Sequence, residues 1–159
     1  MANKISSKKT VIRPLESKDI KSVIDLLQAI SDFRPCKTDY DQLWKSYHAQ
    51  KNVIAIVAET NIGIGGFASL LIEQKLRGGR VGHIEDVVTH SELRELGIGS
   101  MLIEALIEKA KLNGCFKVVL WCESNNAAFY EKNSFKAVGS AMEYRLEMKR
   151  RETLQPKRD

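Results

Sequence analysis

The chain has few residues of the kinds that build disulfide frameworks, metal sites or membrane spans. Its three cysteines, Cys36, Cys115 and Cys122, are widely spaced and include no C-x-x-C pair, which argues against a disulfide framework and a cysteine zinc site. No two histidines stand at metal-ligand spacing, so we expect no metal. No apolar run approaches the roughly 18 residues of a membrane span, and no secretory signal is apparent. We therefore expect a cytoplasmic protein without a membrane partner.

The net positive charge lies at the two ends of the chain and not in its body. Residues 1–10 and residues 149–159 each carry a formal charge of +3, so the residues between them carry −1 of the total +5. No basic face with interleaved aromatic residues is visible, and we expect no nucleic-acid partner. The 159 residues, 43% apolar and 28% charged, predict one domain over residues 9–148, with residues 1–8 and 149–159 as flexible basic tails.

Hydrophobic periodicity and turn residues predict a mixed α+β sandwich. Residues 116–122 are apolar almost throughout, which predicts a strand buried on both faces. The element order is not the alternating pattern of a Rossmann fold; it favours one mixed, mostly antiparallel sheet flanked by helices. The expected strands are 10–13, 53–58, 64–75, 81–89, 116–122 and a final pair at 135–138 and 141–148; the expected helices begin at Ser17, at Thr38 or Asp39, at Met101, and at Ser124 or Asn125, with a loop at 31–37.

The stretch from Arg94 to Ser100, R-E-L-G-I-G-S, stands between a predicted strand and a predicted helix. Glycine permits backbone conformations and close approaches that a side chain would forbid. The first turn of a helix has unpaired N–H groups at the positive end of the helix dipole. The stretch therefore suits an anion such as a phosphate, although an ordinary glycine-containing loop fits the pattern equally well.

Two motifs together resemble the GNAT acetyltransferases. Arg94-x-x-Gly97-x-Gly99 resembles the acetyl-CoA pyrophosphate loop of that family, and residues 126–135 resemble its late N-x-x-x-F-Y motif. The resemblance covers about residues 10–148 and implies the GNAT fold with acetyl-CoA as cosubstrate. The implied cofactor contacts are Val87, Val88, Thr89, Arg94, Glu95, Leu96, Gly97, Ile98, Gly99, Ser100, Trp121, Cys122, Glu123, Asn126 and Tyr130.

Residues 72–75 (I-E-Q-K) and 82–88 (G-H-I-E-D-V-V) resemble the branch of the family that acetylates an amino-sugar phosphate. The implied reaction transfers the acetyl group of acetyl-CoA by direct attack to the amine of D-glucosamine 6-phosphate, giving N-acetyl-D-glucosamine 6-phosphate for UDP-GlcNAc biosynthesis. The resemblance also implies a homodimer with shared active sites. The implied acceptor contacts are Ser31, Lys75, Leu76, Glu85, Asp86, Val87, Phe116, Lys117 and Arg145.

Tyr130, Glu85 and Asp86 are the candidate catalytic residues. The Tyr130 phenol, with a pKa of roughly 10, remains a proton donor at neutral pH and would protonate the departing thiolate; the alternative is a tyrosine packed in the core. Glu85 and Asp86 are adjacent on a strand, so we expect their side chains on opposite faces. A bulge near Val87 and Val88, as in the family, would free backbone N–H groups for the oxyanion.

Two residues depart from the family pattern, and other functions stay open. Ser134 stands where glycine is usual, which predicts a looser turn before Phe135. Trp121 stands where an acidic residue is usual, so any role of that acid passes to Glu85, Asp86, Glu123 or water. A GNAT enzyme acting on a polyamine, an aminoglycoside or a protein N-terminus is an alternative, as is a non-catalytic CoA-binding or RNA-binding module. Direct attack needs no acyl-enzyme, and Cys122 is expected to be buried filler.

Overall fold

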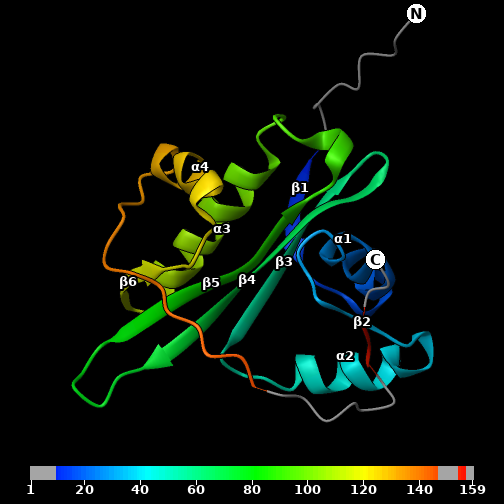
Figure 1. The fold of residues 1–159 in the computed structure, drawn as a ribbon, viewed down its shortest axis with the longest axis horizontal. Coiled ribbons are helices and arrows are strands. Elements are labelled where there is room, and N and C mark those ends of the chain that lie inside the picture. The colour runs from blue at the N-terminus through cyan, green and yellow to red at the C-terminus, as the bar shows by residue number, and fades with distance from the viewer. Residues whose placement is uncertain (1–9, 147–153, 157–159) are drawn as a thin grey trace, which may run out of the picture.

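One five-stranded sheet with helices on both faces organises the chain (Figure 1). A computed structural model describes residues 10–146 and 154–156. Short 3-10 turns precede α1, α2, α3 and α4. The strands are β1 (Val11–Pro14), β2 (Phe33–Pro35), β3 (Val53–Thr60), β4 (Gly63–Gln74), β5 (Arg80–Thr89), β6 (Cys115–Val119) and β7 (Leu154–Pro156), and the helices are α1 (Ile20–Leu27), α2 (Tyr40–His48), α3 (Ile98–Leu112) and α4 (Ala127–Lys132).

The large sheet has the strand order β1-β3-β4-β5-β6. Its first four strands are antiparallel, because β3, β4 and β5 follow one another through short turns, and only β6 runs parallel to its neighbour β5. A parallel neighbour needs a crossover, and α3 supplies it. The predicted mixed, mostly antiparallel sheet flanked by helices is confirmed.

The sheet has one apolar cluster on each face. The larger cluster packs Leu102, Ile103 and Leu106 of α3 onto Leu70 of β4 and Ile84 of β5, all nearly inaccessible to solvent. The smaller cluster joins α1 to the opposite face through Val23, Val57, Phe67 and Val88. Figure 1 shows α3 and α4 on one side of the sheet and α1 and α2 on the other. No helix among residues 10–146 combines the length and the apolar character that crossing a bilayer would require.

A buried ion pair ties the first strand to the first helix. Arg13 donates to both carboxylate oxygens of Asp19, at 2.7 and 3.0 Å, and also contacts Glu59 on β3. The Glu16 N–H donates to the same Asp19 carboxylate at 2.9 Å, which caps the turn before α1. The Asp19 side chain is only 4% exposed. Its hydrogen bonds to Arg13 hold the pKa of the Asp19 carboxyl below its usual value, although burial acts in the other direction.

The final pair of strands predicted at 135–138 and 141–148 is wrong for the described residues. Residues 134–146 form no strand, and this segment crosses in front of β5 and β4 toward α2 (Figure 1). A strand needs a neighbouring ladder for its N–H and C=O groups, and the described residues of the single chain offer this segment none. Four of its large apolar side chains are therefore exposed: Val138, Met142, Tyr144 and Leu146.

The predictions for the last long strand and for the tails also need correction. The strand predicted at 116–122 ends at Val119, and Phe116 and Trp121 are 61% and 63% exposed, so the segment is not buried on both faces. The predicted loop at 31–37 contains β2, which pairs with β7 from the predicted C-terminal tail. The other residues of the predicted tails, including 1–8, lie outside the described part of the chain.

Two helices begin at residues other than those predicted. The turn before α1 is capped by Glu16 rather than by Ser17, and the α-helix proper begins at Ile20. Helix α3 begins at Ile98, ahead of the predicted Met101. The earlier start of α3 brings part of the predicted anion loop into the first helical turn.

Candidate active site

β6 is short and pairs only with the beginning of β5. Their register runs from Arg80 opposite Cys115 to His83 opposite Val119. β5 then continues to Thr89, and no described strand lies along that edge. The backbone groups along this edge of β5 have no partner in β6, so a ligand can lie beside β5 beyond the end of β6.

The predicted bulge is present in β5. Opposite β4, Glu85 pairs with Ser69 and Val88 pairs with Phe67, so Asp86 and Val87 together face one residue of β4. Asp86 has a φ of 53°, in the left-handed region that residues with side chains rarely adopt.

The bulge overturns the prediction that Glu85 and Asp86 point to opposite faces. Val87 packs with the α3 cluster and Val88 with the α1 cluster, so the extra residue at 86 interrupts the alternation. Glu85 shares its face with Ser69, its directly paired residue. The negative charge of Asp86 reaches Tyr47 of α2, which also interacts with Ser69. Both carboxylates therefore belong to the α2 side.

Asp86 is a carboxylate without a partner. No hydrogen bond or ion pair joins it to another of the described residues, and burial raises the pKa of its carboxyl. Burial likewise raises the pKa of the Tyr47 hydroxyl, and the charge of Asp86 raises it further. Sequence reasoning missed Tyr47, because an aromatic residue on the apolar stripe of a helix has the pattern of a core residue.

The anion loop follows β5 through a 3-10 turn at Ser91–Leu93. Gly97 caps α3 with a φ of 80°, and Glu95 also lies in the left-handed region, with a φ of 69°. These turns direct the chain into α3, whose first N–H groups lack intrahelical partners. Arg94 is exposed and has no ion-pair partner among the described residues, so its guanidinium is available to an anion.

Gly99 packs closely against an aromatic ring of α4. A Cβ placed at Gly99 would lie 3.0 Å from Cζ of Phe129, so the ring of Phe129 lies against the first turn of α3. This contact joins the two sequence motifs and places α4 beside the anion loop. Asn126 is the N-cap residue of α4, and its side chain makes no capping hydrogen bond.

Tyr130 lines a cavity between β6, α4 and the segment after α4. Its ring meets the rings of Phe129 and Phe135 edge to face, with centroids 5.0 and 6.0 Å apart. Burial, with a smaller effect from Cys122, raises the pKa of the Tyr130 phenol, so it keeps its proton at neutral pH. Three further predicted cofactor residues lie nearby: Trp121 and Cys122 line the same cavity, and Glu123 caps the turn at Ser124–Asn126.

The turn after α4 is closed despite the serine at 134. Ser134 adopts a φ of 68°, and its N–H donates to the Glu131 carbonyl at 3.0 Å. The Phe135 N–H donates to the Tyr130 carbonyl at 3.0 Å. These two bonds form a Schellman motif, which usually has glycine at this position. The turn holds Phe135 against Tyr130, so the predicted loosening is not observed.

A charged cluster lies on the sheet at the β4–β5 hairpin. The Glu73 carboxylate accepts from Lys75 Nζ at 2.6 Å, and the same oxygen lies 2.8 Å from His83 Nε2. Lys75 was predicted as an acceptor contact, whereas Glu73 had no assigned role. Leu76, the next residue, is fully exposed at the hairpin.

The remaining predicted acceptor residues each have a contact of their own. The Ser31 hydroxyl donates to the Phe33 carbonyl at 2.6 Å, within the loop after α1. Lys117 lies over the ring of Phe116, with Nζ 5.7 Å from the centroid. Arg145 donates to Asp32 at 3.2 Å and pairs with Glu143. The three predicted cations, Lys75, Lys117 and Arg145, thus contact different partners in the described single chain and share none.

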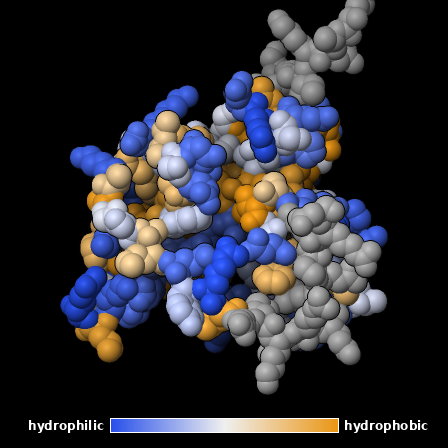
Figure 2. Space-filling view, viewed as in Figure 1, coloured by the Kyte–Doolittle hydropathy of each residue, from blue (hydrophilic) through white to orange (hydrophobic). Residues whose placement is uncertain are grey.

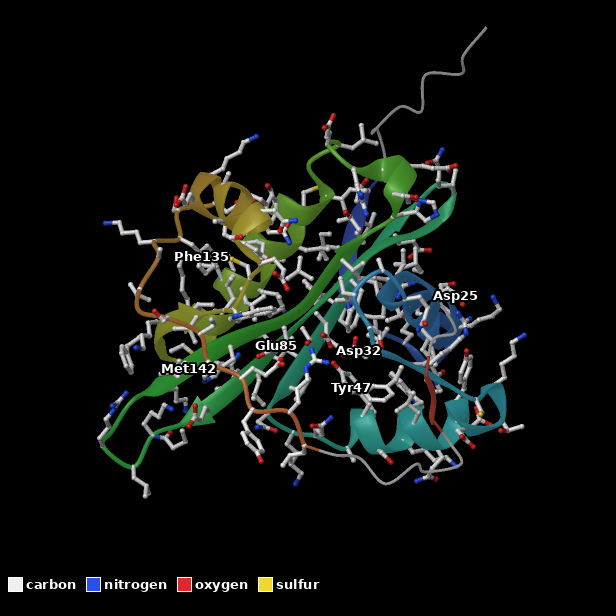
Figure 3. All side chains as sticks on the ribbon, in the orientation of Figure 1. Asp25, Asp32, Tyr47, Glu85, Phe135 and Met142 are labelled. Carbon is white, nitrogen blue, oxygen red and sulfur yellow. The ribbon has the colours of Figure 1, made fainter. Side chains whose placement is uncertain are left out.

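A hollow separates the two sides of the molecule on the face shown in Figure 2. It lies between the part that carries α3 and α4 and the part that carries α1 and α2. Figure 3 places Glu85 of β5, Asp32 and Tyr47 around this region. Among the described residues, no group of three or more His, Cys, Asp or Glu side chains is arranged to hold a metal ion.

Comparison with known proteins identifies the family. The profile of the acetyltransferase (GNAT) family matches residues 20–135. Glucosamine 6-phosphate N-acetyltransferase of Trypanosoma brucei brucei is 36% identical over 130 residues, 79% of this chain and 88% of that protein. The crystal structure of glucosamine-6-phosphate N-acetyltransferase from Arabidopsis thaliana has a TM-score of 0.80 at 29% identity, covering 88% of this chain and all of that one. Because the family match spans the bulge, the anion loop and Tyr130, the chain belongs to the GNAT family of acetyltransferases.

Proposed function

We propose that this enzyme transfers the acetyl group of acetyl-CoA to the amine of D-glucosamine 6-phosphate, giving N-acetyl-D-glucosamine 6-phosphate and CoA. The proposal is based on three features that lie together: the opening between β5 and β6, the anion loop that follows β5, and Tyr130 on α4. Relatives that match most of the chain are named for this reaction. The product would enter UDP-GlcNAc biosynthesis in the cytoplasm.

Acetyl-CoA would lie with its pyrophosphate at the start of α3. The unpaired N–H groups of Ile98, Gly99 and Ser100 and the guanidinium of Arg94 supply donors and positive charge there. The thioester would then lie in the opening beside the bulge. The backbone N–H group of Val87, at the bulge, is suited to the carbonyl oxygen, whose negative charge grows in the transition state; Val88, the other predicted residue, pairs with Phe67 of β4 instead.

The chemistry removes two protons from the acceptor ammonium. Asp86 accepts the first, and the neutral amine attacks the thioester carbonyl carbon to form a tetrahedral intermediate. The C–S bond then breaks, and the Tyr130 phenol donates its proton to the departing thiolate. The second proton of the amine nitrogen then reprotonates Tyr130. The proton on Asp86 passes to solvent. A carboxylate with a raised pKa suits this role, because its proton affinity is closer to that of the amine.

The sugar phosphate would be bound by Lys75, Lys117 and Arg145. A second copy of the chain would bring these cations together, since the segment that carries Arg145 exposes Val138, Met142, Tyr144 and Leu146. Apolar side chains in such a segment favour burial against a partner. We therefore propose a homodimer in which this segment contributes to a shared active site. Light scattering after size exclusion tests the dimer.

A thiol-release assay with acetyl-CoA and a panel of amines tests the function. We expect turnover with glucosamine 6-phosphate and much less with glucosamine, spermidine, an aminoglycoside or a peptide N-terminus. Tyr130→Phe should lower kcat by on the order of 100-fold with little change in either KM, because the phenol acts on the leaving group. Tyr40→Phe, on the opposite side of the sheet, is the control. Preferred turnover of another amine would replace the proposed acceptor.

A further inference from the structure

Glu73 holds two basic side chains with one oxygen atom. Lys75 Nζ lies 2.6 Å from Glu73 Oε2, and His83 Nε2 lies 2.8 Å from the same oxygen. A carboxylate only accepts, so the His83 ring donates its Nε2–H in this contact. The three side chains are partly exposed, at 26% for Lys75, 29% for His83 and 43% for Glu73, so a ligand can reach them without unfolding the sheet.

Strand geometry explains why these residues meet. Glu73 and Lys75 are two apart at the end of β4, so they point to the same face. His83 pairs with Leu71, which makes it the diagonal neighbour of Glu73 on that face. Ser69, two residues before Leu71, and Glu85, two after His83, share the face as well. The cluster therefore continues the acceptor side of the site along β4 and β5.

The cluster restricts a side chain that would otherwise be mobile. Lys75 follows the last residue of β4, and four rotatable bonds separate its ammonium from the backbone. The bond to Glu73 uses one of its three donors and leaves two for a ligand. The pKa of the Glu73 carboxyl is lowered by its hydrogen bonds to Lys75 and then to His83, so it stays ionised as an acceptor.

We propose that Glu73 and His83 are positioning residues that hold the Lys75 ammonium toward the phosphate of a sugar-phosphate acceptor. The inference rests on the proposed function for the identity of that acceptor. Glu73 does not itself attract a phosphate, because both are negative; its effect passes through Lys75. The bond from His83 restrains the same Glu73 oxygen that accepts from Lys75. The cluster thereby favours phosphorylated over unphosphorylated sugars.

Steady-state kinetics of Glu73→Ala test the proposal. We expect the KM for glucosamine 6-phosphate to rise about fivefold, the effect of losing one typical hydrogen bond, with kcat and the KM for acetyl-CoA unchanged. Glu73→Gln keeps an acceptor oxygen and should stay within about twofold of the wild type. In a Lys75→Ala background, Glu73→Ala should change nothing further, because a positioning residue acts through the residue it holds.

Glu108→Ala is the matched control. Glu108 also accepts from a lysine at 2.6 Å, Lys111, but on the exposed surface of α3. It should leave all kinetic constants unchanged. An unchanged or lower KM in Glu73→Ala would overturn the proposal. If Glu73 merely neutralised the charge of Lys75, its removal would strengthen phosphate binding and lower the KM.

Binding of glucose 6-phosphate, which has no amine, separates this inference from the proposed function. Calorimetry should show that the wild type binds glucose 6-phosphate far better than glucose, and that Glu73→Ala weakens this binding about fivefold. Equal affinity for the two sugars would overturn the inference whatever the acetylation assay shows. Good binding of glucose 6-phosphate without acetylation of glucosamine 6-phosphate would instead overturn the proposed function alone.

Discussion

The ion pair between Arg13 and Asp19 predicts how the fold responds to a single substitution, Asp19→Ala. The substitution removes two charge-assisted hydrogen bonds, at 2.7 and 3.0 Å, and the bond from the Glu16 N–H at 2.9 Å. It also leaves the Arg13 side chain, only 16% exposed, without its main partner. Glu59 on β3 continues to contact Arg13 and limits the loss.

We expect Asp19→Ala to destabilise the protein by about 3 kcal/mol. Breaking a buried ion pair typically costs roughly 3–5 kcal/mol, and the remaining contact with Glu59 places this case at the lower end. For a chain of this length, each 1 kcal/mol corresponds to roughly 2–4 °C in Tm, so thermal unfolding followed by circular dichroism should show a decrease of about 6–12 °C.

Asp25→Ala is the matched control. Asp25 lies on α1, the helix that Asp19 precedes, and has two basic partners, Lys21 and Arg34, but its side chain is 39% exposed. Exposed ion pairs contribute little, so its Tm should change much less. An Asp19→Ala decrease no larger than that of Asp25→Ala would refute the reasoning from burial.

The same pair predicts a pH dependence with a definite sign. The pKa of Asp19 is lower in the folded state than in the unfolded chain, where it is about 3.9. Its contribution is therefore complete above the unfolded-state pKa and is lost as the pH falls through the folded-state pKa. The stability difference between wild type and Asp19→Ala should be constant near neutral pH and narrow below about pH 4.

Two further predictions concern the site. Ser134→Gly should raise the free energy of unfolding by about 0.5–1 kcal/mol in denaturant titrations, because glycine adopts the φ of 68° without strain; an unchanged stability would contradict this. Asp86→Asn should remove the acidic limb of the pH profile of kcat/KM. It should also stabilise the protein above the raised pKa of Asp86, where the folded state carries the cost of a desolvated charge. A retained acidic limb would exclude Asp86 as the base.

Local patterns were sufficient to predict most of the sheet. The runs at 53–58, 64–75 and 81–89 are separated by short polar or glycine-containing turns, so each strand could only pair with the next. Gly97 and Gly99 indicated the passage from strand to helix, although α3 begins at Ile98, ahead of the predicted Met101. These signals lie within a few residues of the features that they specify.

Features that depend on distant residues were not predictable in the same way. The segment 135–146 has strand-like residues, but strand formation depends on a neighbour that the described single chain does not offer. The extra residue at Asp86 places every later residue of β5 on the face opposite to the one that regular alternation predicts. The pattern of apolar and polar residues therefore could not predict their orientation. The contact between Glu73 and His83 depends on the register of two strands, which no local pattern specifies.

Because of the bulge at Asp86, the number of residues in β5 matters independently of which residues they are. Before the bulge, Ile84 packs toward α3; after it, Val87 does so, and Val88 packs toward α1. A chain lacking Asp86 would heal the ladder, with Val87 opposite Ala68, and would leave Val87 and Val88 on the faces that they occupy now. The extra residue in β5 therefore serves the site rather than the core, because the core would accept a strand one residue shorter while the bulge and its carboxylate would be lost.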